Sequence, residues 1–122
     1  MTRAETGRSG EAAAARWYQK QGAQLLAHNY HTRMGELDLV LREPDGTIVI
    51  CEVKTRSQGM LQRPAAAVDQ AKQHRLICAA QKYLQQTGQS EEPVRFDVAE
   101  VVPLDSGRWM VHIIKGAFLC ET

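Results

Sequence analysis

The sequence predicts an α/β domain built from one helix, three antiparallel strands, a second helix and two further strands that complete a mixed sheet. Residues 4–21 and 64–86 carry apolar side chains at helical spacing, whereas the stretches between them alternate between apolar and polar residues as strands do. A Pro44-Asp45-Gly46 segment separates two alternating stretches and is typical of a hairpin loop. With 122 residues, the chain is long enough for one domain with its own hydrophobic core.

The first helix is expected over residues 4–21, because the alanines of residues 12–15 are strong helix formers. Trp17 and Tyr18 share one side of this helix. We interpret both as core anchors rather than as platforms for base stacking. Glu11 belongs to the same alanine-rich helix, where an acidic residue ordinarily faces solvent.

Three strands are expected over residues 23–31, 36–42 and 47–55, and the last two form the hairpin. The loop sets the register of the hairpin, so that Asp38 faces Glu52 and Glu36 faces Lys54. Directly opposed side chains in an antiparallel pair lie about 5 Å apart at Cβ. Alternation predicts that one face of the first hairpin strand carries Leu37, Leu39 and Leu41.

The opposed carboxylates of Asp38 and Glu52 indicate a metal site. Charged residues on a strand are usually solvated, and Glu36 with Lys54 fits an ordinary cross-strand ion pair. Two like charges opposite each other, however, destabilise a sheet, and a divalent cation between them would remove that cost. Two carboxylates suit Mg²⁺, which takes few protein ligands and keeps several of its waters. A slip of one residue in the register would undo this prediction.

The second helix is expected to begin at Pro64 and to end near Gln86. A basic stripe borders its apolar face. The stripe consists of Lys72, Arg75 and Lys82. Such a stripe is most often a solvated surface, and beside a nuclease centre it would be a contact for phosphates.

Two segments follow the strands and the helix. The loop over residues 57–63 leaves the end of the third strand directly, which is a position from which it could close over a substrate. Residues 94–102 and 108–115 are expected to form a closing hairpin. Its expected core residues are Phe96, Val98, Val101 and Ile113.

Asp38 followed by Glu52-Val53-Lys54 resembles the D…(D/E)-x-K signature of the PD-(D/E)XK nuclease superfamily. Three longer strings are similar to the YraN-like family of uncharacterised bacterial proteins, which are distantly similar to the archaeal Holliday-junction resolvases. The strings are Gly7-Arg8-Ser9-Gly10-Glu11, Gly35-Glu36-Leu37-Asp38-Leu39-Val40 and Cys51-Glu52-Val53-Lys54-Thr55-Arg56. Leu37 stands where the superfamily name has Pro, and no departure touches the core triad.

This resemblance implies a restriction-endonuclease-like core in a single nuclease-like domain over residues 1–122. It implies an endonuclease that hydrolyses phosphodiester bonds of DNA, with branched or repair and recombination intermediates as candidate substrates. One alternative is a nucleic-acid-binding module that keeps the fold without efficient cleavage. Another is an adaptor domain whose acidic hairpin binds a protein partner. Resolvase relatives act as paired subunits, so a homodimer is also considered.

The resemblance assigns roles to individual residues. Asp38 and Glu52 would hold Mg²⁺, for which Mn²⁺ can substitute, with the Val53 backbone carbonyl and Glu11 as additional ligands. Lys54 would orient the attacking water or stabilise the developing charge. The expected nucleic-acid contacts, chosen for their proximity to this centre, are Arg56, Lys72 and Arg75.

The composition agrees with a nucleic-acid partner and a cytoplasmic location. The net charge is only +1, but basic segments over residues 1–33 and 57–90 flank an acidic hairpin, which suits a nucleic-acid backbone. The three cysteines lack any metal-binding spacing, which indicates reduced thiols in a cytoplasm. The longest apolar runs are too short to span a membrane.

Overall fold

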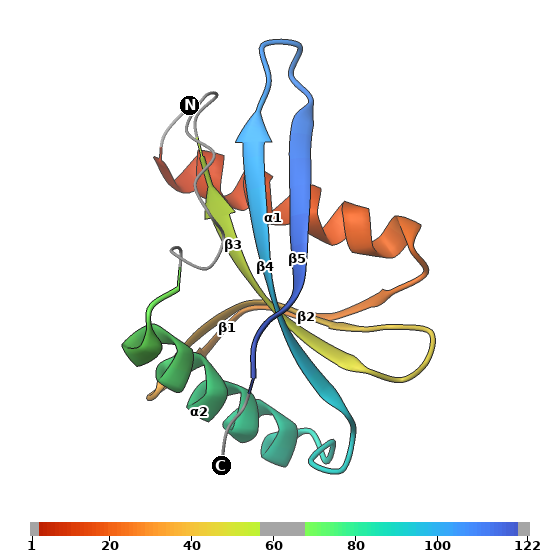
Figure 1. Cartoon of the computed structure of the whole chain (residues 1–122), viewed down its shortest axis with the longest axis vertical. Helices are drawn as coiled ribbons and strands as arrows, with labels where there is room; N and C mark the ends of the chain where they lie inside the picture. The colour runs from red at the N-terminus through yellow and green to blue at the C-terminus, as the bar shows by residue number, and fades with distance from the viewer. Residues whose placement is uncertain (1–2, 57–67, 120–122) are drawn as a thin grey trace.

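The computed structural model describes the backbone of residues 3–56 and 68–119 and the side chains from residue 9 onward. The described residues form two helices and five strands in the predicted order (Figure 1). Their bounds are α1 Arg3–Lys20, β1 Gln24–Thr32, β2 Gly35–Arg42, β3 Ile48–Thr55, α2 Gln70–Gln86, β4 Val94–Pro103 and β5 Trp109–Phe118. The predicted α/β fold class is therefore confirmed.

The five strands form one mixed sheet in the order β1-β2-β3-β4-β5. All neighbours are antiparallel except β3 and β4, which are parallel and are connected through α2. The hairpin loop closes through a hydrogen bond from the Glu43 N–H to the Thr47 carbonyl, 2.9 Å long. The predicted register of this hairpin is confirmed for the recorded pairs, which run from Arg42 with Ile48 to Leu39 with Cys51.

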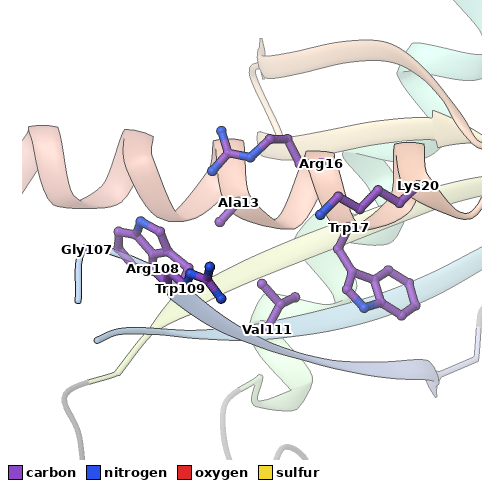
Figure 2. Close-up of a pocket in the computed structure, with 8 residues that line it drawn as sticks. All are labelled: Ala13, Arg16, Trp17, Lys20, Gly107, Arg108, Trp109 and Val111. Atoms are coloured by element: carbon purple, nitrogen blue, oxygen red, sulfur yellow. The ribbon is translucent and has the colours of Figure 1, made fainter. Parts of the chain in front are cut away.

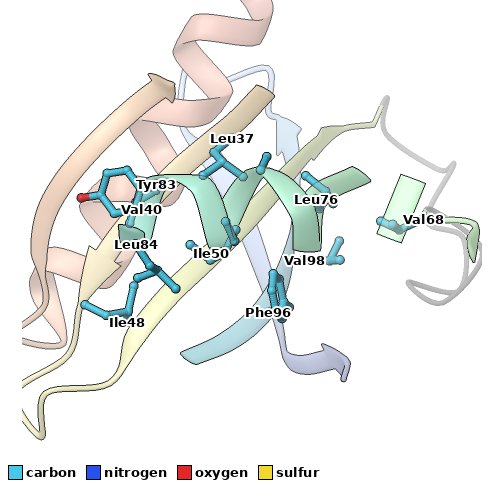
Figure 3. Close-up of a cluster of buried hydrophobic side chains, with 12 residues drawn as sticks. Leu37, Val40, Ile48, Ile50, Val68, Leu76, Tyr83, Leu84, Phe96 and Val98 are labelled. Atoms are coloured by element: carbon cyan, nitrogen blue, oxygen red, sulfur yellow. The ribbon is translucent and has the colours of Figure 1, made fainter. Parts of the chain in front are cut away.

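The two helices cover opposite faces of the sheet, and Figure 1 shows α1 crossing behind β4 and β5. Neighbouring residues of a strand, such as Ile50 and Cys51, belong to different clusters of buried side chains. The α2-side cluster (Figure 3) contains Leu37, Val40, Ile48, Ile50, Val68, Leu76, Ala79, Ala80, Tyr83, Leu84, Phe96 and Val98. The α1-side cluster contains Ala14, Ala15, Tyr18, Ala23, Leu39, Leu41, Val49, Cys51, Ala99 and Val101.

A glycine lets α1 approach the sheet closely. A Cβ atom on Gly10 would lie 2.8 Å from Cγ2 of Val101 and 2.9 Å from Oγ1 of Thr55, closer than real Cβ contacts. A larger residue would therefore push the helix away from the sheet or displace these side chains. The next residue on the helix is Glu11, so this contact also fixes where Glu11 lies.

The second helix begins later than predicted. Asp69 is its N-cap, with an extended backbone and a side chain that accepts a 2.8 Å hydrogen bond from the Lys72 N–H. Val68 and Asp69 are not helical, so the expected continuous helix from Pro64 is wrong. Pro64 itself and the loop predicted over residues 57–63 lie outside the described residues.

The predicted face of Leu37 is also wrong, because Leu37 lies in the α2-side cluster while Leu39 and Leu41 lie in the other one. The alternation breaks where β1 and β2 pair around Asn29. Leu37 pairs with Tyr30 and Leu39 with His28, and Asn29 between them has a left-handed backbone with φ of 50°. The alternation along β2 is thus interrupted between Leu37 and Leu39.

The closing hairpin forms as predicted, although β5 extends to Phe118. Phe96, Val98 and Val101 are buried, and Ile113 is partly buried against the α1-side cluster. Within the described ranges, no helix is both long enough and apolar enough to cross a membrane.

Candidate metal centre

The candidate centre lies where the pairing of β2 with β3 stops. The last recorded pair is Leu39 with Cys51; beyond it β2 pairs with β1, and β3 pairs with β4 as far as Thr55. Asp38 is the next residue of β2 past this point. Its Oδ2 accepts a 2.9 Å hydrogen bond from the Val53 N–H. The Asp38 side chain therefore takes the place of the next backbone hydrogen bond between β2 and β3.

The predicted pair of Glu36 with Lys54 does not form. Glu36 instead lies opposite His31 of β1, and its Oε2 is 3.7 Å from Nδ1 of His31. Lys54 instead lies 3.4 Å from Oε1 of Glu52, two residues earlier on the same strand. The predicted hairpin register is therefore confirmed as far as Leu39 with Cys51, where the recorded pairing of β2 with β3 ends, and the predicted pair beyond it is wrong.

Glu52 is the buried anion of the centre, with a side chain only 6% exposed. Its Oε1 lies 2.6 Å from Nζ of Lys72, which α2 contributes, as well as 3.4 Å from Nζ of Lys54. Lys72 is predicted from the sequence to contact nucleic acid, and its ion pair with Glu52 is not predicted. A contact between residues 20 positions apart depends on how α2 docks, which local sequence patterns do not encode.

Burial and neighbouring charges shift the pKa values of the acid and the two lysines at the centre. Burial, together with the charge of Glu52, raises the pKa of Asp38 to about 7, while the hydrogen bond from Val53 works in the opposite direction. Burial lowers the pKa of Lys54, and the neighbouring Lys72 adds to that effect. Burial also acts to lower the pKa of Lys72, but its contacts with Glu52 outweigh this and raise it.

Glu11 faces the same centre from α1. Burial raises its pKa, and the charges of Glu36 and Glu52 contribute to the increase. A hydrogen bond from the side chain of Asn29 acts in the opposite direction. Asn29 is among the residues that carry the family resemblance but was not predicted as a site residue, and Asn tolerates the left-handed backbone found here better than most residues. The helix and the two strands thus bring three acids near one another.

The donor set fits magnesium better than other common metals. Among the described residues, no group of three or more His, Cys, Asp or Glu side chains is arranged to hold a metal ion. A tetrahedral zinc site would need such a group. Asp38 and Glu52 supply two hard oxygen ligands, which is enough for Mg²⁺ because it retains water. Ligation by Glu11 and by the Val53 carbonyl stays a prediction.

The residues expected to bind nucleic acid are only partly brought together. Lys72 lies at the centre, whereas Arg75 is exposed on α2 and its backbone approaches Gly35. Arg56 directly follows β3, and its N–H donates a 2.9 Å hydrogen bond to the Val101 carbonyl. Its Nε is buried and has no hydrogen-bond partner among the described residues. Their contacts with nucleic acid stay a prediction.

A second buried acid lies beside the centre and was missed by sequence reasoning. Glu100 pairs in register with Lys54 across the parallel strands β3 and β4 and is only 1% exposed. Its Oε1 has no hydrogen-bond partner within the described part of the chain. The signal in the sequence was an acid within the otherwise apolar run from Val98 to Val102.

Comparison with known proteins places the chain among relatives of similar length. The model of the family described as "Uncharacterised protein family UPF0102" matches residues 10–101. A UPF0102 protein of Symbiobacterium thermophilum is 41% identical over 112 residues, covering 92% of this chain and 94% of the relative. One of Bifidobacterium longum is 41% identical over 120 residues, covering 97% of this chain and 96% of the relative. The matched residues include Glu11 and all of the residues from Asp38 to Lys72 discussed above.

Proposed function

This chain belongs to the uncharacterised protein family UPF0102, and we propose that it is a Mg²⁺-dependent endonuclease that hydrolyses phosphodiester bonds of DNA. The proposal includes a distant relation to the PD-(D/E)XK nucleases and a restriction-endonuclease-like core. One observation carries it: Asp38 and Glu52 are drawn together in a partly buried site with Lys54 beside them. The cytoplasmic location expected from the cysteines also stays a prediction.

The two carboxylates favour a bound cation. An isolated pair of buried acids resists ionisation, and the raised pKa of Asp38 is the sign of that resistance. A divalent ion between Asp38 and Glu52 would stabilise both in their charged forms. Acids whose pKa is raised by burial and by a neighbouring acid are typical of functional sites.

The chain's own side chains would share the work of hydrolysis. Asp38 and Glu52 would hold the cation, which supplies Lewis-acid polarisation of the phosphate and an activated water when it is bound. The ammonium group of Lys54 would stabilise negative charge that develops on the phosphate oxygens. Lys72 shares one oxygen of Glu52 with Lys54, so it can turn to a substrate phosphate once Glu52 binds the cation.

The substrate proposed from the sequence is DNA, with branched or repair and recombination intermediates as the first candidates. A domain of 122 residues covers little duplex by itself. A homodimer would extend the contact with DNA, and we include it in the proposal.

A second candidate function is a nucleic-acid-binding module with little or no cleavage. The observation that favours it is the position of the two lysines. Lys54 and Lys72 both lie on Oε1 of Glu52, so this carboxylate is already neutralised without a metal. Under this alternative, nucleic acid binds to the lysines and the acids serve only to position them.

Cleavage of a labelled panel of nucleic acids separates the two functions. The panel contains a four-way junction, a flap, single-stranded DNA, linear duplex and a structured RNA, each tested with Mg²⁺, Mn²⁺ and EDTA. Asp38→Asn removes one charge without changing the shape of the side chain, and Glu91→Gln makes the same kind of change at an exposed loop position as a control. Metal-dependent cutting by the wild type and Glu91→Gln, lost in Asp38→Asn, supports the nuclease. Binding without cutting in all three supports the module.

A further inference from the structure

A second hollow lies between α1 and the β4–β5 hairpin, apart from the candidate metal centre (Figure 2). Its volume is about 620 Å³. The residues that matter for its chemistry are Arg16, Trp17, Lys20, Arg108, Trp109 and Val111. We call it the indole pocket, because its lining includes both tryptophans of the chain.

The lining of the indole pocket combines aromatic rings with positive charge. Arg16, Lys20 and Arg108 are exposed cations, and none of the described residues that line the pocket is acidic. In Figure 2 the two indoles lie at opposite ends, with Val111 between them, and the charged groups of Lys20 and Arg108 reach toward the space between the rings. The pocket therefore offers apolar ring surface and cations in one place.

The two indoles are not simply part of the core. Tyr18, the neighbour of Trp17, is only 1% exposed and donates a 2.6 Å hydrogen bond to Asp97. Trp17 and Trp109 are only partly buried, at the border of the α1-side cluster. The expectation that Trp17 is a core anchor like Tyr18 is thus met only in part, since part of Trp17 stays accessible.

The indole pocket continues toward the candidate metal centre along α1. A Cβ atom on Gly10 would lie 3.6 Å from Cζ3 of Trp109, and the next residue is Glu11. Trp17 lies six residues after Glu11, which is about 9 Å along the helix axis. Arg16 lines both the indole pocket and a cavity of about 370 Å³ that includes Glu11 and Asn29.

We propose that the indole pocket binds an unpaired nucleotide of a nucleic-acid strand, whose base stacks on Trp17 or Trp109 while Arg16, Lys20 and Arg108 contact its phosphates. Aromatic rings beside cations are the usual means of binding single strands, because every base has a face that can stack. A paired base has both faces covered by its neighbours in the duplex, so the pocket selects single-stranded segments. Binding of a nucleotide in this pocket does not depend on the proposed function. Only the path of the rest of the strand to the metal centre rests on it.

Intrinsic fluorescence tests the pocket directly, because Trp17 and Trp109 are the two tryptophans of the chain. The protein is titrated in EDTA with a short oligothymidylate, with the same sequence as a duplex and with thymidine monophosphate. The expected result is quenching by the single strand at much lower concentration than by the duplex. Quenching by the monophosphate at equal concentration would instead identify a site for free nucleotides and overturn the proposal for a strand.

Single-tryptophan variants and charge variants locate the binding. Quenching should persist in at least one of Trp17→Phe and Trp109→Phe, and the tryptophan that remains in that variant is the ring on which the base stacks. Replacing that ring by alanine should weaken binding of the oligonucleotide roughly five- to 150-fold, the range that loss of one stacking platform produces. Arg108→Ala and Lys20→Ala should each lower the slope of log affinity against log salt by about 0.7. Lys115→Ala is the matched control, an exposed cation on β5 outside the pocket.

The outcomes separate this proposal from the nuclease. The proposal is supported if the oligonucleotide quenches the tryptophans and if Arg108→Ala weakens this quenching while Lys115→Ala does not. This holds even if no substrate is cut. If the oligonucleotide fails to bind, or if it binds without quenching and Arg108→Ala behaves like Lys115→Ala, the pocket proposal is wrong. Metal-dependent cleavage can persist in that case, since it depends on Asp38. Because Arg108, Lys20 and Lys115 are exposed, these variants test binding without the loss of a core contact.

Discussion

Two acids on strands β2 and β4, which β3 separates in the sheet, have opposite surroundings. Asp97 on β4 is fully buried and accepts four hydrogen bonds, from the Tyr18 hydroxyl, from Nε and Nη2 of Arg95 and from the Gly116 N–H. Asp38 accepts one backbone hydrogen bond and lies beside Glu52 and Glu11. Asp97, whose oxygens all accept hydrogen bonds, stabilises the fold. Asp38, which has other acids as neighbours and few donors, is instead suited to bind a cation.

The largest expected effect is the loss of stability when the Asp97 network is broken. Asp97→Ala removes one of the two carboxylates that pair with Arg95 and leaves Tyr18 without its acceptor. We expect the free energy of unfolding to fall by about 3–5 kcal/mol, as when one partner of a buried ion pair is removed. Urea unfolding followed by circular dichroism measures this. If the free energy of unfolding falls by less than about 1 kcal/mol, the claim that Asp97 stabilises the fold is wrong.

The next effect concerns the position of α1. Gly10→Ala places a methyl group against Val101 and Thr55, and we expect a loss of about 1–3 kcal/mol from overpacking. Because Glu11 follows Gly10, the affinity for Mg²⁺ should change if Glu11 helps to hold the ion. Calorimetric titration with Mg²⁺ checks this, with Ala12→Gly as a control at an exposed position of the same helix. Unchanged affinity in a folded Gly10→Ala variant would remove Glu11 from the site.

The pH dependence of stability should report the raised pKa of Asp38. Its folded-state pKa, about 7, lies above the ordinary value of 3.8, so the folded protein holds this proton more tightly than the unfolded chain. The resulting stabilisation is complete below pH 3.8 and is lost as the pH rises through about 7. The contribution of one group is at most about 1.4 kcal/mol per pH unit.

The comparison of wild type with Asp38→Asn isolates this contribution. The difference between their free energies of unfolding should shift in favour of Asp38→Asn as the pH rises from 4 to 8, and saturating Mg²⁺ should cancel the shift. Urea titrations at several pH values measure it. A difference that does not vary with pH would mean that Asp38 titrates normally.

The smallest effect is expected for Lys72→Ala. The Lys72 side chain is about one-third exposed, so its ion pair with Glu52 adds little to stability. Removing it, however, removes a competitor for Oε1 of Glu52, and the affinity for Mg²⁺ should rise a few-fold. Calorimetry measures this change, with Lys82→Ala as the control on the same helix. Weaker binding of Mg²⁺ in Lys72→Ala would contradict competition at this oxygen.

The sequence predicted the parts of this molecule that depend on local chemistry. Pro44, Asp45 and Gly46 specify a loop, the loop specifies the register, and the register brings Asp38 next to Glu52. The order of helices and strands followed from the same kind of pattern. These features could be predicted because each depends on residues that are close in the chain.

The features that were missed depend on tertiary contacts or on two local signals that compete. Lys72 contacts Glu52 because α2 docks on that face, which no local pattern specifies. The divergence of β2 from β3 sends Glu36 to His31, and hairpin geometry alone cannot show where two strands separate. For the start of α2, Pro64 and Asp69 are both good signals, and the N-cap bond of Asp69 decides the outcome.

Calorimetric titration of the wild type with Mg²⁺ at pH 8 tests the central claim most directly, in parallel with Asp38→Asn, Glu52→Gln and the control Glu91→Gln. If Asp38 and Glu52 form a metal site, the wild type and Glu91→Gln will bind Mg²⁺ with the same affinity, and Asp38→Asn and Glu52→Gln will each lose binding. Equal binding by all four proteins, or none by the wild type, would contradict the claim.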